Sequence, residues 1–317
     1  MVDFKYLYQG LCGLARAHRA GAMAGHLGAA VVAAYFFGEN RPGLDRGVYA
    51  GIEKESDRIM RGEETVWFDP KKAGVTIPEL FEPFGEERPR AESISSIAEA
   101  LAGNIDKTRQ SGHNVIFASI ALRALHDHPV YATPSIVEGI GKLIRGFDGQ
   151  HPGRGYYGQE RGWIVGDKGP IAPDDDVPPY DSLGSMAEVV VDELIRGSSV
   201  RRQGFGGLYH VINHAAGLAE LAQYGYGDLA EKGLAAQRHH VLLWRALPDV
   251  ESELGPVRRS EHDPGTAAYW TGPPLRRDSA MLTHRIKTLY GFFTLLRLIE
   301  DRAKRDRAEA SFLYLMA

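Results

Sequence analysis

The sequence predicts an all-α protein built from repeated helical hairpins, and three observations support this fold class. Apolar residues recur at helical spacing along most of the chain, whereas the period-two alternation of β-strands is confined to short pieces such as 162–165. Several of the expected helices begin with a histidine. The histidine-headed helices and the helices that follow them also recur at similar spacing, which indicates a diverged structural repeat.

The first repeat covers about residues 8–61. A helix expected over 8–20 is followed by a second over 26–37 that is apolar almost all round, as is typical of a helix buried on every side. A Gly/Pro-rich turn then leads to an amphipathic return helix over 44–60. Prolines punctuate the segment that follows, 61–90, which we expect to be a long loop.

The second repeat, 91–147, has the same organisation. A first helix is expected over 91–108, and a histidine-headed helix begins at His113. A threonine suited to cap a helix, followed by proline, opens the return helix over 135–147. The next segment, 148–182, is rich in Gly, Pro and aromatic residues and is expected to be a second long loop.

The third repeat covers 183–247, and a partial fourth covers 281–310. The third contains an expected helix over 207–224 and a return helix over 228–247. A third long loop, 248–279, separates the two repeats. Each complete repeat has a glycine in its return helix, 25, 26 and 23 residues after the leading histidine: Gly51, Gly139 and Gly233.

Two architectures accommodate such hairpins. An open solenoid has short, regular links and a concave surface for protein partners. A closed α/α toroid would place the apolar histidine-headed helices inside and the amphipathic return helices outside. Loops of about thirty residues and the all-apolar helix over 26–37 favour closure. We therefore expect one all-helical domain, 1–317, with the long loops at the histidine end of a toroid.

Composition excludes several classes of function. The formal net charge of -4 gives no general attraction to nucleic acid or to an anionic membrane. A single cysteine, Cys12, forms no intramolecular disulfide and suits a reducing compartment. The most apolar stretch, 22–37, is shorter than the ~20 residues needed to span a bilayer, and the N-terminus has no signal-peptide pattern. We expect a cytoplasmic protein whose partner is a small molecule.

The histidines suggest where that small molecule binds. His26, His113, His210 and His284 head helices that would line the inside of a toroid, and His214 lies one helical turn after His210 on the same face. Helix N-termini carry partial positive charge and favour an anionic or carbonyl-bearing ligand. The prediction is a small-molecule enzyme with a histidine-lined central cavity.

Three interpretations of this histidine set remain open. His210 and His214 have the spacing of two metal ligands on one turn, and another histidine would complete a site for a divalent metal such as Zn or Fe. Alternatively, the histidines act as general acids and bases without a metal, with Tyr209 as a neighbouring phenol donor. In the third interpretation the histidines are structural, and the chain is a helical-repeat binding protein.

Two further motifs carry weaker signals. The segment 201–207 places two arginines and several glycines just before a helix, where it would receive a phosphate, but it matches neither a P-loop nor G-x-G-x-x-G. The acidic run 174–176 lies in a proline-flanked loop, where we expect a solvated turn, with contact to a metal ion as the alternative.

The segment 210–221, the turn and return helix after it, and 283–287 resemble parts of the questin oxidase-like family. The resemblance covers two or three short stretches. It implies an all-helical fold with histidines at helix starts, and an oxidoreductase. The named member of that family opens an aromatic polyketide ring oxidatively with a reduced nicotinamide cofactor, which for this chain would be NADPH. The chain itself has no dinucleotide-binding fingerprint.

Overall fold

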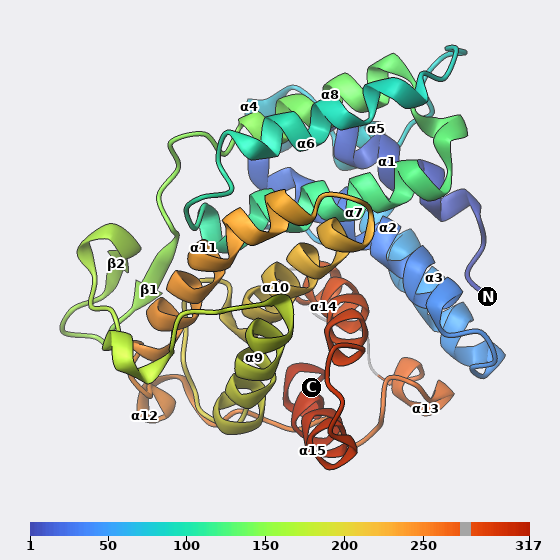
Figure 1. The fold of residues 1–317 in the computed structure, drawn as a ribbon. Coiled ribbons are helices and arrows are strands. Elements are labelled where there is room, and N and C mark those ends of the chain that lie inside the picture. The colour runs from blue at the N-terminus through green and yellow to red at the C-terminus, as the bar shows by residue number, and fades with distance from the viewer. Residues whose placement is uncertain (273–279) are drawn as a thin grey trace. The chain divides into compact units, whose positions relative to one another are not determined.

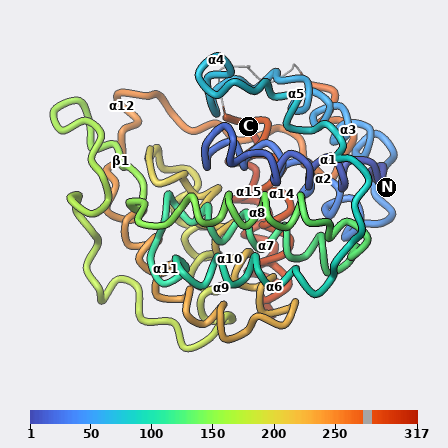
Figure 2. The backbone as a smooth tube through the Cα atoms, turned by 90° about the horizontal axis from the view of Figure 1, so that it is seen from above, coloured from blue at the N-terminus to red at the C-terminus, as the bar shows by residue number. Residues whose placement is uncertain are grey.

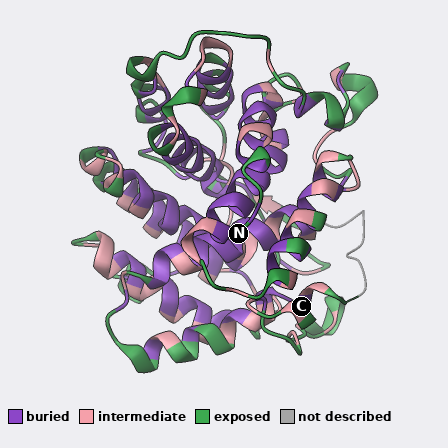
Figure 3. Ribbon diagram, turned by 90° about the vertical axis from the view of Figure 1, so that its right-hand side faces the viewer, coloured by how far each residue is buried: buried purple, intermediate pink, exposed green. Residues whose placement is uncertain are grey.

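The computed structural model describes residues 1–272 and 280–317, and nearly all of its regular structure is helical (Figure 1). The prediction of an all-α protein is confirmed. Within the described residues the one sheet is a small antiparallel hairpin of β1 (Arg154–Tyr156) and β2 (Trp163–Val165), in which Gly155 pairs with Ile164. Buried residues run along the helices, and exposed residues gather in the connections and on outer helix faces (Figure 3).

Contacts between Cα atoms group the chain into two compact units, and each unit is assembled from three separate stretches of chain. The first unit consists of 1–103, 117–147 and 262–290, and the second of 104–116, 148–261 and 291–317. The single domain predicted from the sequence stays a prediction, because this division does not test whether either unit folds without the other. The closed toroid stays a prediction as well.

The first unit is built around the helix pair α1 (Lys5–Ala17) and α2 (Gly25–Asn40), which lie side by side in Figures 1 and 2. Helix α2 is apolar all round and almost completely buried, as its sequence predicts. Helix α8 (Pro134–Arg145) packs on α1, and α3 (Arg46–Met60) packs on α2. The remaining helices of this unit are α4 (Pro70–Ala73), α5 (Ile77–Leu80), α6 (Ser95–Ala102), α13 (Ala267–Trp270), and most of α7 (His113–Asp127) and α14 (Met281–Leu296).

The second unit centres on α10 (Gly207–Gln223). Helix α10 packs against both α9 (Leu183–Gly197) and α11 (Gly227–Arg245). Helix α15 (Arg302–Phe312) packs on α9, and the short α12 (Glu251–Leu254) follows α11. The pair α10 and α11 is therefore a helical hairpin, as the third repeat predicts.

The glycines that suggested the repeat lie at points of close packing. A Cβ atom on Gly139 would lie 2.3 Å from the carbonyl oxygen of Ala15, so α8 and α1 approach each other backbone to backbone. A Cβ atom on Gly51 would lie 2.3 Å from Trp270, and one on Gly233 would lie 2.5 Å from a methyl group of Leu218 on α10. Each return helix thus has its glycine where a neighbour leaves no room for a side chain.

Some predicted boundaries were wrong. The helix expected over 91–108 ends at Ala102, because Gly103 and Asn104 are weak helix formers and the Asn104 amide donates to Asp148 at 2.8 Å. The long loops also contain short helices, α4 and α5 in the first and α12 and α13 in the third. The last part of the third loop, 273–279, lies outside the described residues.

Among the described helices, none combines the length and the apolar character needed to cross a bilayer.

Candidate functional site

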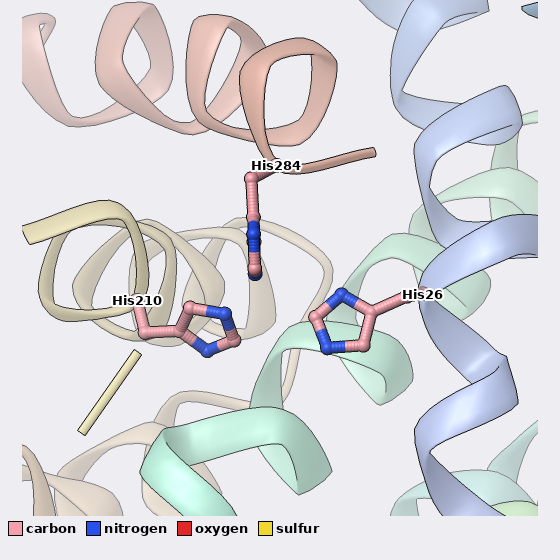
Figure 4. A group of neighbouring side chains, drawn as sticks. All are labelled: His26, His210 and His284. Atoms are coloured by element: carbon pink, nitrogen blue, oxygen red, sulfur yellow. The ribbon is translucent and has the colours of Figure 1, made fainter. Parts of the chain in front are cut away.

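A group of ring and amine side chains surrounds His26, at the start of α2 in the first unit; His26 and Lys287 are buried, whereas Trp67 and His284 are half-buried. The His26 ring stacks on the Trp67 indole with centroids 3.7 Å apart and planes 15° apart. The His284 ring meets it edge-on, at 4.9 Å and 87°. Figure 4 shows both imidazoles, His26 reaching from α2 and His284 from α14; it also labels His210, which belongs to the second unit. The Nζ atom of Lys287 is hydrogen-bonded to Nδ1 of His26. These four residues, His26, Trp67, His284 and Lys287, are the His26 cluster.

Glu64 fixes the position of this cluster. Its side chain is completely buried, and its carboxylate accepts hydrogen bonds from the backbone N–H of Leu282 at 2.8 Å and of Thr283 at 3.3 Å. These donors belong to the first turn of α14, where a carboxylate is favoured by the unpaired N–H groups and the helix dipole. The same carboxylate accepts a bond from the Trp67 indole at 2.7 Å. Burial raises the pKa of Glu64, and these hydrogen bonds oppose that shift. One carboxylate therefore holds both Trp67 and the helix that carries His284 and Lys287.

Lys287 is the most unusual member of the cluster. It is 1% exposed, and no ion pair involves it among the residues that the structure describes. Burial lowers the pKa of Lys287 well below its ordinary value, and the charge of Glu64 offsets this shift only in part. A neutral amine has a lone pair, so Lys287 has the chemistry of a base, a nucleophile or a ligand. Strongly perturbed ionisable groups gather at functional sites.

In the second unit, two histidines hold a strained turn. The backbone of Gln110, Ser111 and Gly112 has φ of 43°, 62° and 81°, so three consecutive residues are left-handed and two of them are not glycine. Nδ1 of His113 is hydrogen-bonded to the Gln110 carbonyl, and Nδ1 of His210 lies 3.3 Å from the Ser111 carbonyl. A carbonyl only accepts, so Nδ1 carries the proton in both rings and Nε2 is the basic nitrogen of the neutral form. The two rings contact each other, with centroids 4.3 Å apart.

A second histidine pair in this unit has a defined proton arrangement. Nε2 of His240 donates to the Phe205 carbonyl at 2.8 Å, so in the neutral ring Nδ1 of His240 is an acceptor. Nδ1 of His214 lies 3.3 Å away and must supply the proton of this contact. Nε2 of His214 is then the basic nitrogen, and it is buried with no hydrogen-bond partner among the described residues. Burial lowers the pKa of both rings, of His240 to about 4, and the neighbouring histidines lower that of His214 further. Both rings are therefore neutral at pH 7.

The predicted site residues divide between the two units. His26 and His284 lie together in the first unit, whereas His113, His210 and His214 lie in the second. Among the described residues, no three histidine, cysteine or carboxylate side chains that all belong to the second unit come within 4.8 Å of one another. Within that unit the predicted ligand pair His210 and His214 thus has no third ligand. The Tyr209 hydroxyl donates to the Leu315 carbonyl at 3.0 Å, and its catalytic role stays a prediction.

Sequence reasoning did not identify Lys287, Trp67, Glu64 or His240. A signal existed for Lys287, which follows His284 by three residues and so shares its helix face. Trp67 and Glu64 lie in the loop after α3, where no periodicity indicates their contacts. His240 stands beside His239 in a return helix that was treated as an outer, amphipathic element.

Comparison with known proteins found no match: no protein-family model, no curated protein and no solved structure. The resemblance to the questin oxidase-like family stays an expectation drawn from short stretches of sequence.

Proposed function

We propose that this chain is a metal-assisted enzyme that acts on a small molecule, with His26 and His284 among the ligands of a divalent ion. The observation that carries the proposal is the buried Lys287, which is hydrogen-bonded to His26 and forms no ion pair among the described residues. An amine in this position loses the hydration of its charged form and, within the part of the chain that the structure describes, gains no ion pair in return. A methionine of similar volume would pack there without that loss, so function is the simplest reason for an amine.

The two imidazoles suit one ion. Ligand nitrogens of His26 and His284 lie within 4.8 Å of each other. Two nitrogens bonded to one Zn or Fe ion at about 2.1 Å lie at most roughly 4.2 Å apart, so little movement is needed. With Lys287 accepting the Nδ1 proton of His26, Nε2 is left to bind the ion, and metal-binding histidines usually have such an outer partner. Trp67 covers one face of the ring and limits the entry of water.

A catalytic ion of this kind takes about three protein ligands and keeps an open position for substrate. The sequence repeat makes His113, His210 and His214 the candidates for further ligands. An Fe ion with imidazole ligands would fit the oxidoreductase that the family resemblance implies, with NADPH as an external reductant, whereas Zn would support hydrolysis or proton transfer. Iron is the first choice on that ground.

Metal analysis of single variants tests the proposal. The protein is purified without chelator, loaded anaerobically with Fe(II) or Zn(II), and desalted before elemental analysis. We expect one ion per chain in the natural protein and at least a tenfold weaker affinity in His26→Ala and His284→Ala, whereas His262→Ala, an exposed histidine of the same unit, keeps full occupancy. Circular dichroism confirms that each variant is folded. Substoichiometric metal in the loaded natural protein, or full occupancy in both cluster variants, refutes the proposal.

One observation favours the second candidate, a helical-repeat binding protein with structural histidines. His113 and His210 each satisfy a carbonyl of the strained turn 110–112, a purely structural task. On this interpretation His113→Ala and His210→Ala lower the melting temperature, and no variant changes the metal content, because no metal binds. The same purified variants therefore separate the two functions.

A further inference from the structure

The second unit contains a charged pocket that the proposed metal site does not use. It has a volume of 430 Å³ and lies between the ends of α9 and α11 and the segment that precedes α10. Three guanidinium groups and two carboxylates line it, which leaves an excess of positive charge. The lining residues are Asp176, Glu193, Arg196, Gly197, Arg202 and Arg245.

Glu193 already has its partners. The side chain is 3% exposed, and Oε1 accepts hydrogen bonds from Arg196 at 2.7 Å and from Arg245 at 2.8 Å and 2.6 Å. Asp176 is exposed, and its backbone carbonyl accepts a further bond from Arg245. The buried carboxylate is thus committed to two arginines, and the third, Arg202, forms no ion pair among the described residues.

Two buried donor atoms, one on a lining residue and one on its neighbour, have no acceptor among the described residues. They are Nε of Arg202 and Nε1 of Trp244, whose ring centroid lies 5.7 Å from the guanidinium carbon of Arg202. An indole N–H and a guanidinium group donate hydrogen bonds and never accept them, so neighbouring donors leave them unsatisfied. Trp244 is 3% exposed and lies beside Gly197 of the pocket wall. A Cβ atom built on Gly197 would lie 3.7 Å from Nε1 of Trp244. Burial lowers the pKa of Arg202, and the negative charges of Glu193 and Asp249 offset this shift only in part.

We propose that this pocket binds the phosphate group of a small ligand. A phosphate carries negative charge and several oxygens that accept hydrogen bonds, so it can pair with the Arg202 cation and with the donor atoms of Arg202 and Trp244 that have no acceptor. The pocket is larger than a phosphate, so the rest of a phosphate ester also fits. Arg202 belongs to the arginine- and glycine-containing segment 201–207, where the sequence indicated a phosphate site without a known motif. Here the side chains supply the donors, which explains why no glycine-rich fingerprint is needed. The proposal is independent of the metal site.

Isothermal titration calorimetry with inorganic phosphate and with phenyl phosphate, at constant ionic strength, tests it. We expect binding with a Kd of about 1 mM or tighter, at least tenfold weaker in Arg202→Gln and about threefold weaker in Trp244→Phe, which keeps an aromatic ring but removes the N–H. Arg201→Gln makes the same change of charge one residue away, outside the pocket lining, and should alter the Kd less than twofold. Melting temperatures establish that the variants are folded.

Three results would overturn the proposal. The first is no binding of either probe at about 20 mM, far above the expected Kd. The second is an equal loss of phosphate affinity in Arg201→Gln and Arg202→Gln, which would indicate a general effect of net charge. The third is binding of acetate and benzoate as tight as that of the phosphates, which would make this a carboxylate site.

Discussion

Replacing Lys287 by methionine tests whether the buried amine is kept for function at the expense of stability. Methionine fills a similar volume and needs no hydrogen-bond partner, whereas the lysine is 1% exposed and forms no ion pair with a described residue. Replacing a buried ion pair by apolar residues of similar size is often neutral or stabilises by about 1–4 kcal/mol, and we use the same range for this single buried amine. We expect Lys287→Met to raise the free energy of unfolding by about 1–4 kcal/mol at pH 7, measured by urea unfolding. The same variant should bind the metal ion more weakly.

A second buried lysine provides the matched control. Lys304 is 8% exposed but forms ion pairs with Glu188 and, at 2.8 Å, with Asp192. Both carboxylates are partly exposed, so Lys304→Met should lower the free energy of unfolding by only about 1 kcal/mol. The two substitutions therefore have opposite expected signs.

The pH dependence gives an independent check of the Lys287 argument. Because the folded-state pKa of Lys287 is lowered, the unfolded chain binds more protons than the folded one below the ordinary lysine pKa of about 10.4. The lowered pKa thus reduces the free energy of unfolding below that pH. Lys287→Met removes this effect, so its gain in free energy of unfolding should shrink as the pH approaches about 10.4. A loss of stability in this variant as large as in Lys304→Met, or a gain that does not change with pH, would show that Lys287 is an ordinary structural residue.

Three further predictions concern stability. Burial lowers the pKa of His240 to about 4, whereas the unfolded chain has an ordinary histidine pKa of about 6.5, so the unfolded chain binds more protons between these values. The free energy of unfolding should therefore fall by about 3 kcal/mol from pH 6.5 to pH 4. If His240→Gln shows the same slope of this free energy against pH, the prediction is wrong. Gly112→Ala places a Cβ atom 2.5 Å from the His214 ring, so calorimetry should show a larger drop in melting temperature than for Gly21→Ala. Gly21 also has a positive φ, but no atom lies within 4 Å of its Cβ position, so equal drops in melting temperature would exclude the clash. Gly139→Ala should lower the free energy of unfolding, measured in urea, by about 1–3 kcal/mol, because α8 must move away from α1 to make room for the Cβ atom. An unchanged unfolding midpoint would disprove that close contact.

The helices could be predicted because their signals are local. The apolar run of α2 and the periodic patterns of α10 and α11 placed each helix within a few residues of its observed bounds. The predicted extension of the helix from 91 to 108 failed for a tertiary reason, since the Asn104 side chain bonds to Asp148, 44 residues away. A closed toroid has no local signal in the sequence, so the repeat pattern alone could only suggest it, and it stays a prediction.

The candidate site could be predicted in part. His26 and His284 were found because both head helices, and the structure brings them together in the first unit. Glu64 could not be found, because its role depends on hydrogen bonds to Leu282, 218 residues away in the sequence. His240 was missed because its importance comes from a tautomer that is defined by the Phe205 carbonyl, and no spacing rule reports such a contact.

The interleaved composition of the first unit constrains how the chain folds during synthesis. Its third stretch, 262–290, is made more than a hundred residues after its second stretch ends at 147. At about 5–20 residues per second, Lys287 leaves the ribosome roughly 7–30 s after that point. For that interval His26 lacks its amine partner, and the apolar α2 lacks its final neighbours from α14. The nascent chain therefore presents a partly uncovered helix through most of translation, and a fragment that ends before residue 281 should aggregate or recruit chaperones when it is produced alone.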